Sequence, residues 1–448
     1  MKRTLKIIVS LTVMLSSLGW KCMADELIRI NTTDNSHNAS IIRHYSLGKD
    51  VVCINSDRPY FIMLEEGNPS AYALYVDLDI VYDVQIENDT VYFCGKKASL
   101  ATGGGVVGYF DVASLFTMSY ANVTYLHLHN ITSVSALKVG FYANRRHVAA
   151  IGTDAPLRTS KVVDLVKDIV SWSIYYGTLD NNDMVFYDLE ITENYIVITS
   201  QVSPNRKARL WFFVKPTAAG APLFSGNNYY YDIEYPFVGK YLVKHRRRDE
   251  FVTAYMSNQD PEKGTYLCLS FYNGFCYPDN MFSMVSHPNL SLMDIAVGPT
   301  LNQTVGDEVS VLLNGSFSPV SRSEIIGYPY GVFTFYSTYG HIHYDVFLSS
   351  LDVADGLHVV ASGNNSLSGI PTFDKMNKGV NYGNCLVTIP TSLWYSGIEH
   401  RLHTAEVGSC GFSQTSQVIA ADRKEMQIET ICISTNSTDE EETEKEDE

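Results

Sequence analysis

The 448-residue sequence lacks the short motifs that mark the common hydrolases and nucleotide-binding enzymes. It contains no GxSxG nucleophile elbow, no HExxH zinc-binding helix and no Walker phosphate-binding loop. Its glycine run at 103–105 precedes an expected strand instead of a helix, which favours a flexible loop over a phosphate cradle. No two cysteines have the CxxC spacing, so the usual structural zinc sites are not expected. The sequence therefore implies no cofactor.

Positive charge is also scarce. The formal net charge is −16, and no broad basic stripe interrupts the acidic composition. Such a surface repels nucleic acid, so no nucleic-acid partner is expected. The one basic cluster, at 244–248, is interpreted as a solvated turn. Residues 434–448 are polar and strongly acidic, which predicts a disordered tail.

Long hydrophobic runs are missing too, so no transmembrane segment is expected. Residues 1–24 are typical of an export signal, because basic residues precede a short apolar run and small residues follow it. Cys22 offers an alternative as a lipid-modified cysteine, but Lys21 occupies the position where a lipoprotein signal needs a small residue. We expect a protein that is exported to the periplasm, the cell surface or the medium.

Cysteine is limited to eight residues, of which seven remain after removal of the expected signal. An odd number leaves at least one thiol free in an exported protein. Cys268 and Cys276 flank a hairpin with Asn273-Gly274 near its tip. A type I′ turn at these two residues would pair Cys276 with Phe271, whereas a wider loop would place the two sulfurs opposite each other. The sequence does not decide between these two registers, and it therefore does not decide whether Cys268 and Cys276 form a disulfide.

Strand-forming residues are abundant. The chain has 30 Tyr and 20 Phe, and Val, Ile, Thr and Tyr dominate its periodic segments. One β-hairpin pattern occurs twice in the sequence, at 82–95 and at 187–200. Each copy consists of a strand with alternating polar and apolar residues, a polar turn and an apolar strand. Asp83 and Asp188 are 105 residues apart, and Asp294 opens a related strand 106 residues later. Similar hairpins occupy the half-steps, so the repeating unit is about 52 residues.

A unit of this length with about four strands is the signature of a β-propeller blade. The sequence predicts an all-β propeller over residues 25–433, with seven blades and with six as the alternative; stacked β-sandwiches are the competing fold. A strand at 426–433 would join the first blade and close the ring without open sheet edges. Residues 403–421 are expected to hold a last, degraded copy of the unit, and 160–170 a short helix.

The strand 88–95, the glycine loop after it and the strand 107–110 resemble secreted, propeller-like proteins of unknown function from Bacteroidales-type bacteria. The resemblance covers one blade, and the rest of the chain matches only in its period. It implies an exported propeller and supplies no catalytic residues that could be assigned to this chain.

Histidines and aspartates are two groups of candidate site residues. His127 with His129, and His341 with His343, are spaced by two, which puts both imidazoles of a pair on one strand face. Such a face could hold a metal, although no further ligands are visible and a polar strand face is the alternative.

Asp77, Asp79 and Asp83 alternate with apolar residues, so they are expected on one strand face. Close carboxylates repel each other unless a cation lies among them or water solvates them. At the channel of a propeller they would suit a glycoside hydrolase or lyase, and solvated edge acids are the alternative.

Four tyrosines form the third candidate group: Tyr229, Tyr230, Tyr328 and Tyr330. They are expected in exposed loops, where they would stack on sugar rings or anchor a protein partner. Two functions follow. The first is an exported, non-catalytic binding or scaffold propeller that recognises a glycan, a peptide or a protein, and the second is a polysaccharide-active enzyme with the aspartates at the channel. The missing catalytic motifs favour the first, because the fold itself hosts both kinds of function.

Overall fold

The structure is a computed structural model. It describes residues 26–30, 39–99, 103–119, 121–129, 131–142, 145–154, 159–167, 172–178, 184–202, 207–215, 228–233, 237–258, 265–276, 282–286, 289–300, 306–317, 320–331, 338–344, 346–366, 368–378, 400–404 and 414–433. The expected export signal at 1–24, with Cys22, and the acidic tail at 434–448 lie outside these ranges. No helix within them is both long and apolar enough to cross a membrane.

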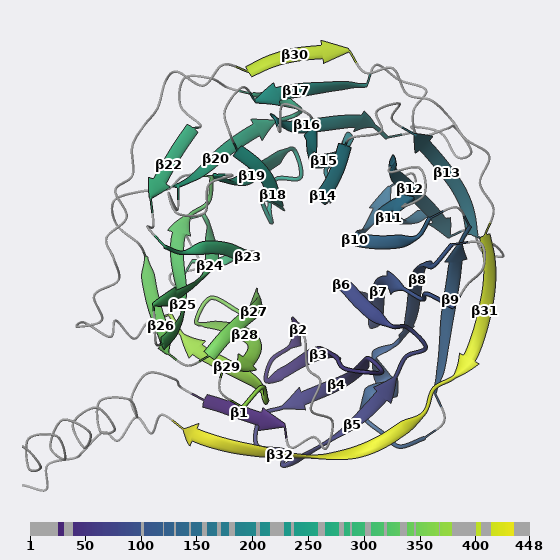
Figure 1. Ribbon diagram of the computed structural model, residues 1–448, viewed down its shortest axis with the longest axis vertical. Coiled ribbons are helices and arrows are strands. Elements are labelled where there is room, and N and C mark those ends of the chain that lie inside the picture. Colours follow the sequence, from purple (N-terminus) through teal and green to yellow (C-terminus); the bar gives the residue numbers. More distant parts are fainter. Residues whose placement is uncertain are drawn as a thin grey trace, which may run out of the picture.

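The strands form a ring of seven blades, which confirms the β-propeller and excludes the six-bladed alternative (Figure 1). The chain builds the blades in sequence order, and each blade is an antiparallel sheet whose first strand lies nearest the ring axis. This arrangement places one strand from every blade around the centre.

The strands of the first four blades are as follows. Blade 1 contains β2 (Ala39–Ser46), β3 (Lys49–Asn55), β4 (Tyr60–Glu65) and β5 (Ser70–Tyr75). Blade 2 contains β6 (Ile80–Glu87), β7 (Thr90–Lys96), β8 (Gly105–Asp111) and β9 (Asn122–Leu128), with the short 3-10 helix η1 (Val112–Leu115) before β9. Blade 3 contains β10 (Ser133–Tyr142), β11 (Arg145–Asp154), β12 (Thr159–Lys167) and β13 (Trp172–Thr178). Blade 4 contains β14 (Met184–Ile191), β15 (Tyr195–Val202), β16 (Lys207–Val214) and β17 (Tyr229–Ile233).

The remaining three blades follow the same plan. Blade 5 contains β18 (Phe237–Lys244), β19 (Phe251–Asn258) and β20 (Thr265–Tyr272), and both β21 (Phe275–Cys276) and β22 (Phe282–Ser286) pair with β20. Blade 6 contains β23 (Ser291–Pro299), β24 (Asp307–Phe317), β25 (Val320–Pro329) and β26 (Tyr339–Tyr344). Blade 7 contains β27 (Val346–Val353), β28 (His358–Asn365) and β29 (Pro371–Asn377), and β1 (Glu26–Ile30) completes it.

Two strands far apart in the sequence close the ring. β1 pairs with β29 at the outer edge of blade 7. β32 (Arg423–Ile433) lies between β1 and β5, so blades 7 and 1 merge into one nine-stranded sheet (Figure 1). The predicted closure by a C-terminal strand is confirmed, and the strand joins the first blade at its outer edge.

Two further strands lie on the outside of the ring. β30 (His400–Thr404) pairs with β17 of blade 4, and β31 (Gln414–Ala420) pairs with β9 of blade 2 (Figure 1). The prediction of a degraded blade at 403–421 is therefore wrong for the described part of that segment. These residues have strand character because they cover the outer edges of blades that already exist, and covering an edge removes exposed backbone groups.

The core is divided among the blade junctions. Seven hydrophobic clusters occur in the described ranges, and each lies between two neighbouring blades. Middle strands are thus covered on both faces, which gives continuous apolar runs without a period of two. The prediction of a short helix at 160–170 is wrong for residues 160–167, and residues 168–170 lie outside the described ranges. Val162, Val163 and Leu165 are all buried in strand β12, with both faces of the strand against neighbours.

Six of the seven inner strands contain a β-bulge close to their first residues. The bulged residues are Tyr82, Ser135, Tyr187, Lys240, Met293 and Ser349. Successive bulges are 52, 53 or 56 residues apart, which confirms the predicted period of about 52. A bulge bends its strand and frees backbone groups from the ladder. Side chains of neighbouring blades can bond to these freed backbone groups near the centre of the ring.

The hairpin of blade 5 has the two-residue turn. Asn273 and Gly274 both have positive φ, and Phe271 pairs with Cys276, which is the register of a type I′ turn. Cys268 is buried and is not part of a disulfide. The wider loop and its disulfide are therefore excluded.

Met426→Ala is expected to lower the free energy of unfolding by about 2–5 kcal/mol. The Met426 side chain is buried in the cluster between blades 7 and 1, where β32 closes the ring. Urea unfolding followed by tyrosine and tryptophan fluorescence would measure the change. Gln427→Ala, at the exposed neighbouring position of the same strand, is the control and should change stability by less than about 0.5 kcal/mol. Equal midpoints for the two variants would contradict a closure that depends on this contact.

Candidate functional site

The inner strands of all seven blades surround a cavity of about 450 Å³ in the centre of the ring. Cavities of about 300–1,000 Å³ are typical of small-molecule sites. The wall includes five basic and five acidic residues: Arg43, Lys138, Lys240, Lys244, Arg246, Asp83, Asp188, Glu190, Asp294 and Asp352. The candidate site is therefore a polar channel that every blade helps to build.

The six bulged residues all line this channel. A bulge redirects a side chain relative to the normal alternation, and here it does so near the start of the inner strand in six blades. We call this set the bulge tier: Tyr82, Ser135, Tyr187, Lys240, Met293 and Ser349. Its members are two aromatic rings, two hydroxyls, a thioether and one ammonium group.

An aspartate follows the bulge in every second blade. Asp83, Asp188 and Asp294 each accept the N–H of the next residue at 2.8 Å with one carboxylate oxygen. The other oxygen accepts a backbone N–H from the inner strand of the following blade: Leu137 at 3.0 Å, Leu242 at 2.8 Å and Leu351 at 2.9 Å, respectively. We call these contacts the carboxylate clips. They explain the 105-residue period, because one clip serves each pair of blades.

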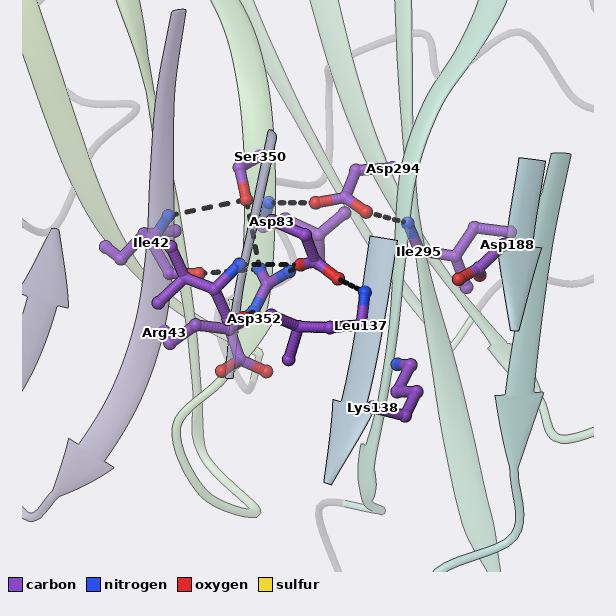
Figure 2. A network of polar contacts seen from close by, with 12 residues as sticks. Ile42, Arg43, Asp83, Leu137, Lys138, Asp188, Asp294, Ile295, Ser350 and Asp352 are labelled. Atoms are coloured by element: carbon purple, nitrogen blue, oxygen red, sulfur yellow. Dashed lines mark hydrogen bonds and ion pairs between the residues drawn. The ribbon is translucent and has the colours of Figure 1, made fainter. Parts of the chain in front are cut away.

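Arg43 joins blade 1 to blade 2. Its Nε donates to the Val84 carbonyl at 2.8 Å, and a terminal nitrogen donates to the carboxylate of Asp83 at 3.1 Å. Figure 2 shows the guanidinium between Asp83 and the hydroxyl of Ser350, which it reaches at 3.2 Å. One cation thereby connects three inner strands.

The other junctions have contacts of their own. Asp352 accepts the His44 N–H at 2.8 Å, Lys138 Nζ lies 3.6 Å from Glu190 Oε2, and the Tyr241 hydroxyl donates to the Met293 carbonyl. A side chain consequently bridges every one of the seven junctions between described inner strands.

Burial shifts the titration of several channel groups. Burial raises the pKa of Asp188 to about 7, although Lys138 opposes the shift. Burial also disfavours the charge of Lys138, but Glu190 and Asp188 outweigh it and hold the pKa of Lys138 above its ordinary value. The pKa of Arg43 is raised in the same way, with burial overcome by Asp83 and its neighbours. These cations are committed to carboxylates of the ring.

The five channel acids use both of their oxygens within the protein. The clip aspartates accept two backbone N–H groups each, as described above. Asp352 accepts from His44 and from Val353, at 2.8 Å each, and Glu190 accepts the Ile191 N–H at 2.9 Å while its other oxygen faces Lys138. No acidic residue in the described wall is left with both oxygens free.

The basic side chains of the channel, unlike the acidic ones, are not all paired within the described protein. Lys240 makes no hydrogen bond or ion pair with any other residue that the structure describes, and burial alone lowers its pKa. Lys244 pairs with Asp249 at 3.3 Å, and the side chain of Arg246 is exposed where it borders the channel. The expected solvated turn at 244–248 is partly correct, since Arg246, Arg247 and Arg248 are exposed, but it also reaches the channel wall.

Of the three predicted aspartates, Asp83 lines the channel and the other two do not. Asp77 pairs with Lys97, and Asp79 accepts the Ala98 N–H at 2.5 Å, so both are held near the end of β7. The reason is that strand β6 begins only at Ile80, so Asp77 and Asp79 lie in the connection after β5 and do not share a strand face with Asp83.

The four predicted tyrosines do not lie in exposed loops, and that expectation is wrong. Tyr229 and Tyr230 belong to β17, Tyr328 is buried in β25, and Tyr330 directly follows that strand. Their contacts are internal: the Tyr229 hydroxyl donates to the Gly274 carbonyl at 2.8 Å, the ring of Tyr230 lies 3.9 Å from the Arg209 guanidinium, and the Tyr330 hydroxyl donates to the Val243 carbonyl at 3.0 Å. A Tyr-rich segment near Gly and Pro resembled a loop, whereas these rings pack between strands.

Three of the four predicted histidines lie in strands: His127 in β9, and His341 with His343 in β26. His129 directly follows β9. His127, His341 and His343 are buried, and His129 is half-buried. His343 Nδ1 lies 3.0 Å from Asp374 Oδ2. Within the described ranges, no group of three or more His, Cys, Asp or Glu residues is arranged to hold a metal ion.

The motifs and spacings of the sequence did not mark Arg43, Lys138, Glu190 or Lys240 as site residues. A usable signal existed, because each bulge position is found by stepping about 52 residues from Tyr82, and Lys240 falls on that series. Arg43 had no such signal, since β2 lacks a bulge at the equivalent position.

Comparisons with known proteins give matches only among solved structures. Neither the family models nor the curated proteins contain a match. Among solved structures, the chain is similar to the Nup133 β-propeller domain of Vanderwaltozyma polyspora, with 8% sequence identity and a TM-score of 0.34. The similarity covers 79% of this chain and 98% of that one. Nothing about ligands or partners follows from a similarity at this level.

Asp294→Ala is expected to destabilise the protein by about 1–3 kcal/mol for each backbone N–H that it leaves without an acceptor. The two groups are those of Ile295 and Leu351. Chemical unfolding would measure the loss, with Glu425→Ala on β32 as a surface control, since Glu425 is exposed. An equal effect of both substitutions would contradict the clip.

Asp188→Asn should change how stability depends on pH. The pKa of Asp188 is raised to about 7 in the folded protein, above an unfolded value of about 3.9. The folded state therefore binds the proton more tightly, and the stability that results is present at low pH and is lost as pH rises through about 7. Between pH 4 and 7 the wild type should lose stability relative to the variant, by at most about 1.4 kcal/mol per pH unit. Parallel unfolding free energies across this range would refute the shift.

Proposed function

We propose that the protein is an exported, non-catalytic propeller that binds a glycan in its central channel. The fold supports a binding or scaffold role, and the export signal expected at residues 1–24 supports a location outside the cytoplasm. The proposal rests on one observation, which is that the acidic side chains of the channel are already bonded within the protein. All five use both oxygens to hold inner strands or to pair with Lys138.

Hydrolysis of a glycoside needs two carboxyl groups that are free to exchange protons or attack the sugar. A carboxylate that accepts two backbone N–H groups is favoured in its ionised form and fixed in position. To act as a general acid, Asp188 would first have to hold a proton on one oxygen, which weakens its acceptance of the Leu189 or Leu242 N–H that holds the strands. The channel acids thus serve the architecture, and binding is the better-supported use of the cavity.

Glycan recognition fits the remaining chemistry of the wall. The bulge tier presents the rings of Tyr82 and Tyr187 at the channel wall. The hydroxyls of Ser135 and Ser349 donate to the Ile151 carbonyl at 3.4 Å and to the Ser40 carbonyl at 2.7 Å, respectively, so they hold strands in place. Tyrosine combines a flat apolar face with a polar tip, which suits a sugar ring that is apolar on one face and hydroxylated at its edge. Tyr187 is held in place because its hydroxyl donates to Gln201 at 2.8 Å.

A polysaccharide-active enzyme is the second candidate. The raised pKa of Asp188, at about 7, is the one observation that favours it, since a general acid needs a proton near neutral pH. Asp83 is the predicted acid that would share the channel with it.

A glycan array probed with the whole protein, followed by mass spectrometry of every bound glycan, separates the two candidates. Binding without new products is the expected result. Cleavage products that vanish in Asp188→Asn would instead establish the enzyme. If no glycan binds, the proposed ligand class is wrong, and peptides become the next class to screen.

Ser135→Trp should lower the affinity of any bound glycan at least tenfold, because an indole at the bulge of β10 fills part of the cavity. Isothermal titration calorimetry would measure the affinity. Gln417→Trp, an exposed position on β31 outside the ring, is the matched control and should leave it unchanged. Undiminished affinity in Ser135→Trp, with a normal unfolding midpoint, would show that the ligand binds elsewhere.

A further inference from the structure

Lys240 differs from every other residue of the bulge tier. It is the bulged residue of β18 and lines the channel, where the equivalent positions of other blades carry hydroxyl, aromatic or thioether side chains. It is also separate from the clips, since the clip at this junction uses Asp188 and the backbone N–H of Leu242. The architecture of the ring does not need an ammonium group at this position.

The charge of Lys240 has no counter-ion in the described protein. Lys138 and Arg43 lie in the same wall, but carboxylates outweigh the burial of both. For Lys240 burial acts alone and lowers its pKa. A partly buried ammonium group without a partner is unfavourable, and an anion brought from solution would relieve that cost.

The surroundings of Lys240 favour an anion that is part of a larger polar molecule. Tyr82 and Tyr187 line the same channel, and Tyr82 is 42% exposed, so aromatic surface is accessible to a ligand there. Arg246, farther along the same wall, is exposed and adds positive potential at the approach. In a chain with net charge −16, such a local basic spot would guide anions to the channel.

We propose that Lys240 anchors the charged group of an acidic sugar, a carboxylate or a sulfate, while the bulge tier surrounds the sugar ring. The inference rests on the proposed function and names the class of glycan and the residue that selects it. Neutral glycans would lack the ion pair and would leave the ammonium group without a partner, so they should bind more weakly.

Matched pairs of probes test the selection. Trigalacturonate is compared with its neutral methyl ester, and N-acetylglucosamine 6-sulfate with N-acetylglucosamine, by calorimetry on the whole protein. At least one acidic form is expected to bind ten or more times more tightly than its neutral partner, and the pair that responds identifies the anion. Lys240→Met should abolish this difference, and Lys240→Arg should keep most of it. Lys424→Met, at an exposed position on β32, is the charge-matched control and should not alter it.

A measurement on the wild type avoids any dependence on folding of the variants. Acetylation of lysines near neutral pH, read by mass spectrometry, should modify Lys240 readily, because its lowered pKa leaves more free amine. The acidic probe should protect Lys240 from acetylation at least several-fold and should leave Lys424 unprotected.

The outcomes separate this inference from the proposed function. Equal binding of acidic and neutral probes, or a preference that survives Lys240→Met, overturns the role of Lys240 while glycan binding stands. Binding of the acidic probe without protection of Lys240 has the same meaning. If neither these probes nor the glycan array yields binding, both the inference and the proposed function are wrong.

Discussion

The carboxylate of Asp83, repeated at Asp188 and Asp294, ties the inner strand of one blade to the backbone of the next. The contact is possible because a bulge frees backbone groups from the ladder at the place where the blades are closest to the axis. Buried N–H groups need acceptors, and a carboxylate is a strong one. The hydrophobic clusters hold the blades face to face, whereas the clips fix the height at which their inner edges meet.

The same contact determines the chemistry of the channel. Acids that hold strands are not available to a substrate, so a wall with equal numbers of acidic and basic residues still presents a free cation. Composition alone would describe this channel as neutral. Its character toward a ligand depends instead on which charges the protein has already paired, and that information is absent from a residue count.

Much of the fold was predictable because the clip requires a particular residue. Asp83, Asp188 and Asp294 recur at nearly constant spacing, and that spacing gave the blade length and the ring. The grouping of Asp77 and Asp79 with Asp83 was wrong, since the alternation of polar and apolar residues begins at Asp77 whereas strand β6 begins only at Ile80. β12 was mistaken for a helix because burial on both faces removes the period of two. Lys240 was not identified because its importance is the lack of a partner, which only the arrangement of neighbours reveals.

Ring closure by β1 and β32 has a consequence for the order of folding. These strands lie about 400 residues apart, and their pairing completes contacts on both sides of the junction. Closing so long a loop is entropically unfavourable, and non-local pairing of this kind is slow. Individual blades can form from neighbouring segments, but the first and the last remain incomplete until the distant ends meet. The finished channel is therefore a late product of folding, and its binding competence should arise in one step with the last sheet.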